Sequence, residues 1–157
     1  MRQILLVVAL SLAPLLTYAQ VTAGVNWKIV SASGAGHFCM DVDENRKADG
    51  TKVFMYPCHG KENQRWTITT SAEGTSALIG TGGYCLDVRG AAAGTGTPVQ
   101  LWKCHFGKNQ RFVIGADGTI KEEGTGKCLQ ASADKAAAAI VIAPCTGNVT
   151  EKWKVEQ

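Results

Sequence analysis

One sequence pattern occurs three times along the chain, and this triplication restricts the possible folds more than any other feature. Each copy has a cysteine-led segment, an alternating segment that ends in a second cysteine, and a polar–aromatic segment. In chain order the copies read CMDV, KVFMYPC, NQRW; CLDV, PVQLWKC, NQRF; and CLQA, AIVIAPC, TEKW. The two cysteines are 19, 19 and 17 residues apart, and successive copies start after 46 and 43 residues. Such an internal repeat indicates structural units that pack on one another.

Each unit is predicted to be β-structure. Apolar positions alternate with period two in the middle segment, so Val53 and Met55 face one way while Phe54 and Tyr56 face the other. The matching inward pairs are Val99 with Leu101 and Ile140 with Ile142. Glycine-rich turns separate the segments, and no segment keeps a helical period. We expect roughly four short strands per unit, or about twelve strands closed around a shared core.

The N-terminus has the features of an export signal. Arg2 provides a basic start, Ile4 to Leu16 is an apolar stretch of 13 residues, and Thr17-Tyr18-Ala19 places small residues before a cleavage point. A membrane anchor is the competing interpretation, but a spanning helix needs about 20 apolar residues. We therefore predict a signal peptide over residues 1–19, a mature domain over 20–157, a secreted extracellular protein and no membrane insertion.

Composition and charge give no indication of a nucleic-acid partner. The net charge of +3 falls to +2 without residues 1–19, because Arg2 is the only ionisable side chain among them. This small net charge does not favour nucleic-acid binding, and the sequence has no Lys/Arg cluster that would favour it. Charged residues make up 18% of the chain and glycine accounts for 18 residues, which is typical of a turn-rich globular protein.

All six cysteines follow the predicted signal peptide, and an even number in an exported chain indicates disulfides. Zinc binding is the alternative. However, the sequence has no C-x-x-C pair, and the neighbours Cys58-His59 and Cys104-His105 lack a second ligand motif. We therefore predict no metal site and no cofactor.

The C-L-D-V, V-Q-L-W-x-C and Q-x-W elements, repeated from about Trp27 to Val155, resemble the ricin-type lectin family. The resemblance implies an all-β fold, a β-trefoil of three pseudo-symmetric four-strand repeats in one domain. The repeats are expected at about residues 27–70, 71–116 and 117–157. One disulfide is implied within each repeat, and the pairs are Cys39–Cys58, Cys85–Cys104 and Cys128–Cys145.

The Q-x-W aromatics are predicted to be core residues, because an aromatic occupies the same place in every repeat. They are Trp66, Phe112 and Trp153. The sequence around Trp27, Asn-Trp-Lys-Ile, resembles Lys-Trp-Lys-Val around Trp153. We therefore expect the two terminal strands to pair, which would protect their edges.

Two repeats carry groups suited to sugar recognition. Sugar hydroxyls need a fixed carboxylate acceptor and an amide donor, and the apolar face of a pyranose packs on an aromatic ring. The resemblance assigns these roles to Asp41, Tyr56 and Asn63 in the first repeat and to Asp87, Trp102 and Asn109 in the second. The alternative for the two aspartates is that each caps backbone amides in a turn.

Further residues adjoin these triads. His59 and His105 follow the second cysteine, where family members often place a residue that borders the sugar; solvated loop histidines are the alternative. Gln64 and Gln110 either steady the neighbouring aspartate or serve the fold.

The two sites are expected to differ at one position. Gln100 stands two residues before Trp102, where the family commonly has a polar residue, and Phe54 takes that place in the first repeat. The first site should therefore be more apolar and have one hydrogen bond fewer.

The third repeat lacks the triad. Gln130 replaces the aspartate, Ala143 the aromatic and Thr150 the asparagine, so this site is predicted to be inactive. Asn148-Val149-Thr150 is a glycosylation sequon, and Asn148 could carry a glycan in a eukaryotic source.

Binding is favoured over catalysis. A glycoside hydrolase needs two opposed carboxylates, whereas the notable aspartates stand one per repeat, and no G-x-S-x-G or phosphate loop is present. We predict a non-enzymatic lectin for galactose- or N-acetylgalactosamine-type glycans with two shallow sites. A xylan-type binding module, or a trefoil interaction protein such as a protease inhibitor or toxin-like subunit, are the alternatives.

Overall fold

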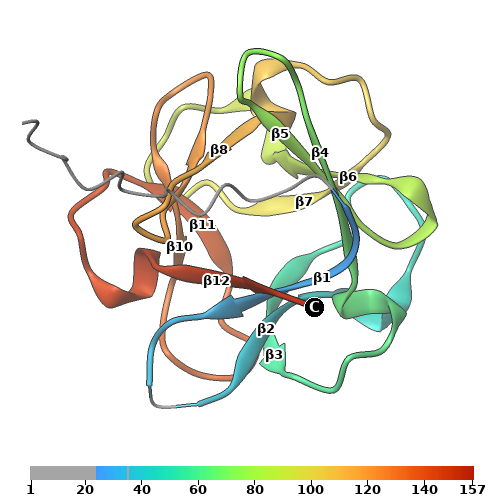
Figure 1. Cartoon of the computed structure of the whole chain (residues 1–157), viewed down its shortest axis with the longest axis vertical. Coiled ribbons are helices and arrows are strands. Elements are labelled where there is room, and N and C mark those ends of the chain that lie inside the picture. Colours follow the sequence, from blue (N-terminus) through green and yellow to red (C-terminus); the bar gives the residue numbers. More distant parts are fainter. Residues whose placement is uncertain (1–23, 35) are drawn as a thin grey trace, which may run out of the picture.

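A computed structural model describes residues 24–34 and 36–157, so the predicted signal peptide over residues 1–19 lies outside the described residues. The described chain forms twelve strands in three groups of four (Figure 1). The first group is β1 (Gly24–Ser31), β2 (Phe38–Val42), β3 (Val53–Pro57) and β4 (Trp66–Thr70). The second is β5 (Ser76–Ile79), β6 (Cys85–Val88), β7 (Val99–Trp102) and β8 (Phe112–Ile114). The third is β9 (Ile120–Glu122), β10 (Cys128–Ala131), β11 (Ile140–Ala143) and β12 (Trp153–Glu156).

Six 3₁₀ turns of three residues connect the strands of the described chain. They are η1 (Asp43–Asn45), η2 (Glu62–Gln64), η3 (Thr81–Gly83), η4 (Arg89–Ala91), η5 (Lys108–Gln110) and η6 (Val149–Glu151). None of the helices in the described segments is long and apolar enough to cross a membrane.

The three groups repeat one hairpin in the same register, which confirms the predicted β-trefoil. Met40 pairs with Met55 in the β2–β3 hairpin, Leu86 with Leu101 in β6–β7, and Leu129 with Ile142 in β10–β11. All six of these side chains are fully buried. The period-two prediction is therefore correct, because alternate cross-strand pairs of each hairpin turn both of their side chains inward.

The three hairpins are joined to one another in a closed cycle. The tip of each hairpin bonds to the second strand of the next hairpin: Gly50 N donates to Leu101 O (2.8 Å), Gly96 N to Ile142 O (2.9 Å) and Ala137 N to Met55 O (2.7 Å). The cycle runs from the first repeat to the second, the third and back to the first. We call this arrangement the hairpin cap. Its backbone bonds hold each repeat against both of the others.

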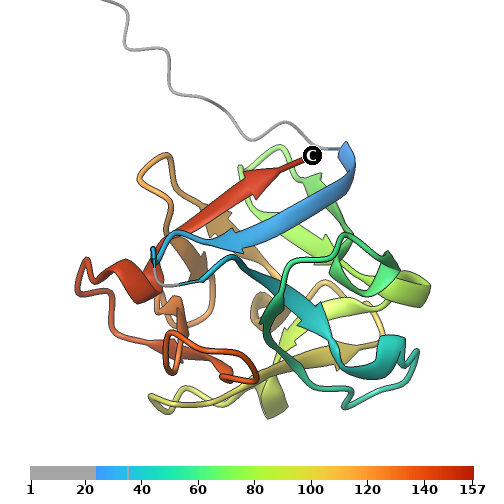
Figure 2. The ribbon, with the colours of Figure 1, turned by 90° about the horizontal axis from the view of Figure 1, so that it is seen from below.

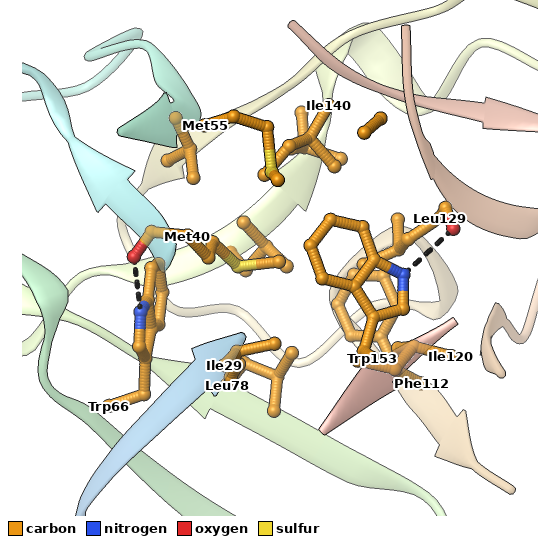
Figure 3. Close-up of a cluster of buried hydrophobic side chains, with 14 of the residues drawn as sticks. Ile29, Met40, Met55, Trp66, Leu78, Phe112, Ile120, Leu129, Ile140 and Trp153 are labelled. Carbon is orange, nitrogen blue, oxygen red and sulfur yellow. Dashed lines mark hydrogen bonds between the residues drawn. The ribbon is translucent and has the colours of Figure 1, made fainter. Parts of the chain in front are cut away.

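The Q-x-W aromatics lie in the core, as predicted, with exposures of 1% for Trp66, 0% for Phe112 and 4% for Trp153. Figure 3 shows the two indoles on opposite sides of the buried cluster. Trp66 Nε1 donates to Met40 O (3.2 Å) and Trp153 Nε1 donates to Leu129 O (3.0 Å). Each bond satisfies a buried polar group and links the last strand of a repeat to its second strand.

The terminal strands pair, and the disulfides have the predicted connectivity. β12 is antiparallel to β1, with Ile29 opposite Val155, and both Figure 1 and Figure 2 show the two strands side by side. Cys39–Cys58, Cys85–Cys104 and Cys128–Cys145 are bonded. Each bond closes a loop with a sequence separation of 17 to 19 residues, which stabilises a repeat by about 3 kcal/mol.

The hairpin cap contains a strained residue that gives a test of the fold. The cap residues Gly50 and Gly96 have φ values of 82° and 87°, and the equivalent Ala137 has a φ of 62°. A left-handed conformation is costly for a residue with a Cβ atom. We expect Ala137→Gly to increase the free energy of unfolding by about 0.5–1 kcal/mol in urea denaturation.

The matched control is Ala138→Gly, at a neighbouring buried position without a positive φ. This substitution should destabilise the protein, because it loses buried area and gains unfolded-state entropy. Equal effects of the two substitutions would contradict the account of the cap.

Candidate functional site

The β2–β3 hairpin and the turn η2 bring the predicted residues of the first repeat together. The hairpin register places Asp41 opposite Phe54 and next to the pair formed by Met40 and Met55. Tyr56 lies two residues further along β3 and is 45% exposed. The turn η2 returns Asn63 to the end of β2. We call Asp41, Tyr56, His59 and Asn63 site 1; these four line one depression of about 280 Å³.

Asp41 is the centre of the hydrogen bonding in site 1. Its carboxylate is 2% exposed and accepts bonds from Asn63 Nδ2 (2.8 Å) and Gln64 Nε2 (2.7 Å). Burial raises the pKa of Asp41 above its ordinary value, although the amide bonds and the nearby His59 oppose this rise. The amide donors therefore fix a buried acceptor in one orientation.

Site 2 is the equivalent group in the second repeat: Asp87, Gln100, Trp102, His105 and Asn109. It lines a depression of about 560 Å³. Asp87 accepts three amide bonds, from Asn109 Nδ2 (2.8 Å), Gln110 Nε2 (2.9 Å) and Gln100 Nε2 (3.2 Å). Trp102 is 40% exposed. The predicted difference is present, because Gln100 supplies a bond to Asp87 that Phe54 cannot supply to Asp41.

Both predicted histidines lie beside the aspartates. His59 Nε2 is 3.3 Å from Asp41 Oδ2, and His105 Nε2 is 3.6 Å from Asp87 Oδ2. In each loop the Nδ1 atom accepts a backbone N–H, from Lys61 (3.2 Å) or Gly107 (3.1 Å). The neutral imidazole therefore carries its proton on Nε2, which faces the carboxylate.

Gln64 and Gln110 do not reach the surface of the sites. Both are 0% exposed, and the four bonds of each amide end within the protein. Gln64 Nε2 donates to Asp41 and to Pro57 O (3.0 Å), while Gln64 Oε1 accepts from His59 N (2.8 Å) and Gly60 N (3.1 Å). Gln110 repeats the pattern. Gln64 and Gln110, which the sequence groups with the carbohydrate-binding residues, therefore position the aspartate and the histidine loop.

Two turns beside the sites were not recognised in the sequence. After the aspartate, Glu44 and Asn45 have φ values of 51° and 53°, and the equivalent Gly90 and Ala91 have 63° and 50°. The turns line the depressions through Asp43 and Glu44 in site 1 and through Arg89, Gly90 and Ala91 in site 2. The third repeat has no positive φ at the equivalent positions 133 and 134. The sequence signal for these turns was the residue that tolerates a positive φ shortly after each Asp-Val pair, namely Asn45 and Gly90.

The third repeat keeps the scaffold but not the group. Ala143 is 7% exposed and has no ring to offer. Gln130 Nε2 donates to Thr150 Oγ1 (3.1 Å), so the two replacements bond to each other. Asn148 of the sequon is exposed. These positions lack the carboxylate, the aromatic plate and the asparagine amide that sites 1 and 2 share.

Glu151 occupies the position of Gln64 and Gln110. Its carboxylate accepts bonds from Thr146 N (2.9 Å), Thr146 Oγ1 (2.8 Å) and Gly147 N (2.9 Å). Burial acts to raise the pKa of Glu151, but the hydrogen bonds from Thr146 and Gly147 outweigh it and hold the pKa below its ordinary value. An ionised carboxylate cannot donate to an aspartate, so this repeat has also lost the means to position one.

Comparisons with known families agree with this arrangement. A family model of the ricin-type beta-trefoil lectin domain matches residues 74–157, and a model of the ricin-type beta-trefoil lectin domain-like family matches residues 16–102. A search of curated proteins found no match.

Several solved structures share the fold. The designed threefold-symmetric protein ThreeFoil is 23% identical, with a TM-score of 0.79 over 83% of this chain and 97% of that chain. A non-toxic homologue of type II RIPs from Momordica charantia, in complex with α-methyl-D-galactoside, is 22% identical, with a TM-score of 0.69 over 87% and 49%. An exo-β-1,3-galactanase from Clostridium thermocellum is 19% identical, with a TM-score of 0.74 over 83% and 30%. The chain therefore spans about half of the Momordica protein and less than a third of the galactanase.

The role of Glu151 predicts how the third repeat responds to a restored aspartate. By pseudo-symmetry, Gln130→Asp would place a carboxylate beside Glu151. We expect the single variant to lose about 1–3 kcal/mol of unfolding free energy at neutral pH. Adding Glu151→Gln should recover most of this loss, and acidification should reduce it by protonating the pair. Equal stability of the single and double variants in urea denaturation would contradict this account.

The pKa of Asp41 gives a second test. A carboxyl ¹³C NMR titration should give a pKa above 3.8, because burial disfavours the charged form. Asn63→Ala removes a donor to the ionised form and should raise the pKa further. Asn109→Ala is the matched control in the other repeat and should leave the Asp41 titration unchanged. An Asp41 pKa that does not change in the Asn63→Ala variant would contradict the hydrogen bond from Asn63 to Asp41.

Proposed function

Because the chain belongs to the ricin-type beta-trefoil lectin domain family, we propose that it is a secreted, non-enzymatic lectin that binds glycans through sites 1 and 2. The observation that carries the proposal is a buried aspartate, held by amide donors in the same depression as an exposed aromatic ring, in two repeats and not in the third. Export is supported by the three disulfides, since such bonds persist in oxidising compartments.

The aspartates provide the acceptor that sugar hydroxyls need. A carboxylate has about four acceptor positions, and in site 1 Oδ1 and Oδ2 each take one amide bond. The remaining positions can accept hydroxyl protons at the floor of the depression. Since the oxygens are already oriented by Asn63 and Gln64, little side-chain entropy is lost on binding.

The asparagines provide an exchangeable partner. Asn63 Nδ2 donates to Asp41 at 2.8 Å and to Val42 O at 3.3 Å, and Asn109 repeats these contacts with Asp87 and Val88. The longer bond is the weaker one. A sugar hydroxyl can replace it while the bond to the aspartate remains.

The exposed rings provide the stacking surface. Tyr56 meets Phe54 edge to face, with ring centroids 6.1 Å apart, and His59 at 5.9 Å. These contacts hold the tyrosine ring without covering it. Trp102 has the larger ring system and lines the larger depression. We therefore propose that site 2, with its additional Gln100 bond to Asp87, is the tighter of the two.

Galactose-type sugars are the first candidates, because the Momordica structure contains α-methyl-D-galactoside. Xylan-type polysaccharide is the second candidate. We propose binding without catalysis, because each aspartate is surrounded by donors that stabilise it as a fixed acceptor. The match to the galactanase covers only 30% of that enzyme, so it concerns one part of it.

The proposal predicts separable losses. Tyr56→Ala should remove site 1 and Trp102→Ala site 2, each weakening binding at that site by about tenfold or more while leaving the fold intact. Calorimetry with methyl galactoside and lactose should then give one site per protein instead of two. Val113→Ala, at an exposed residue outside both depressions, is the control.

A glycan array defines the sugar and tests the whole proposal. Binding to galactose-terminated or xylan-type glycans, lost in the double variant Tyr56→Ala/Trp102→Ala, is the expected result. An array without any bound glycan would contradict it and would favour a trefoil interaction protein that keeps the scaffold alone.

A further inference from the structure

A third depression lies between sites 1 and 2, against the hairpin cap. Its volume is about 470 Å³, and we call it the bridging cavity. It is lined by Asp43, Gly50, Lys52, Val53, Phe54, Arg89, Pro98, Val99, Gln100, Ala137 and Ala139. Asp43 and Phe54 also line site 1, and Gly50, Arg89 and Gln100 also line site 2. The bridging cavity therefore adjoins both sites.

The strand pattern explains this continuity. The outward positions of β3 are Phe54 and then Tyr56, and those of β7 are Gln100 and then Trp102. The cap brings the inner ends of these rows together, because Lys52 bridges to Gln100 and Phe54 bridges to Ala139. Each row thus leads from the bridging cavity to the aromatic of one site.

The lining of the bridging cavity combines the apolar and the hydrogen-bonding groups that a sugar ring needs. Pro98, Val99 and the two alanines provide apolar surface for the C–H face of a pyranose. Asp43, Lys52 and Arg89 provide an acceptor and donors for hydroxyls, and none of the three forms a salt bridge within the described residues. These charged groups are therefore available to a ligand.

We propose that site 1, the bridging cavity and site 2 form one groove that binds a single oligosaccharide chain, with one sugar residue in each site. The inference rests on the proposed function of the two sites and adds the length of the ligand. It also gives the third repeat a role, because its small residues Ala137 and Ala139 leave space in the floor of the groove.

The energetic consequence is measurable. When one chain occupies site 1, the part that reaches site 2 binds intramolecularly, at a high effective concentration. A chain long enough to span the groove should bind about 10²-fold more tightly than a single sugar. Each protein molecule should bind one such oligosaccharide, but two molecules of a monosaccharide.

The test is calorimetry with β-1,4-linked galacto-oligosaccharides and xylo-oligosaccharides of increasing length, next to the monosaccharides. Light scattering establishes that each complex contains one protein molecule. We expect the stoichiometry to fall from two ligands to one as the chain becomes long enough. Two long chains per protein, a complex of two proteins on one chain, or an affinity that does not depend on length would overturn the proposal.

Two variants change the lining of the bridging cavity at residues that line neither site 1 nor site 2. Ala139→Trp fills the cavity and Lys52→Ala removes a rim donor; both residues are exposed and line only the bridging cavity. Each should reduce the gain from chain length by tenfold or more and leave monosaccharide binding unchanged. Ala136→Trp and Lys154→Ala are the matched controls and should behave as the native protein.

The blocking variants distinguish failure of the groove from failure of sugar binding at sites 1 and 2. If the monosaccharides bind and both blocking variants keep the full gain from chain length, the groove is contradicted while the sites stand. If neither monosaccharides nor oligosaccharides bind to the native protein, the proposed function fails and the groove fails with it.

Discussion

Burial of apolar surface around one axis is the constraint on which the structure depends. A unit of about 45 residues is too small to bury an independent core. Each repeat therefore contributes its inward residues, such as Met40, Leu86 and Leu129, to a common cluster. The hairpin cap closes that cluster by bonding each repeat to the next. The disulfides then hold the loops that return from each hairpin, and these loops carry the histidines and asparagines of the sites.

The sites use this scaffold in a specific way. A buried carboxylate is costly unless donors surround it. The scaffold supplies those donors from η2 and η5, so Gln64 and Gln110 connect the fold to the function. The third repeat shows the reverse case, because Glu151 satisfies its loop but cannot hold an aspartate. Loss of the site and retention of the fold are therefore compatible within one chain.

The repeated spacing made much of this predictable. The inward aliphatics follow from a period-two pattern in three copies, whereas the cysteine pairs and the grouping of Asp41 with Asn63 were implied by the resemblance to the ricin-type lectin family. The complete burial of Gln64 was not predictable, because it depends on how η2 packs beneath β2. The left-handed turns at Glu44 and Gly90 were also missed, since short 3₁₀ turns leave little periodic signal. The bridging cavity could not be predicted because it lies between repeats, where only the three-dimensional arrangement places Lys52, Arg89 and Ala139 together.

The central claim is that two repeats bind sugar and the third does not, and backbone ¹⁵N NMR during titration with methyl galactoside tests it most directly. The account predicts chemical-shift changes at the Trp102 indole N–H and at the amides around Tyr56, Asn63 and Asn109. It predicts no comparable changes around Gln130, Ala143 and Thr150. Changes confined to the third repeat, or equal in all three, would contradict it.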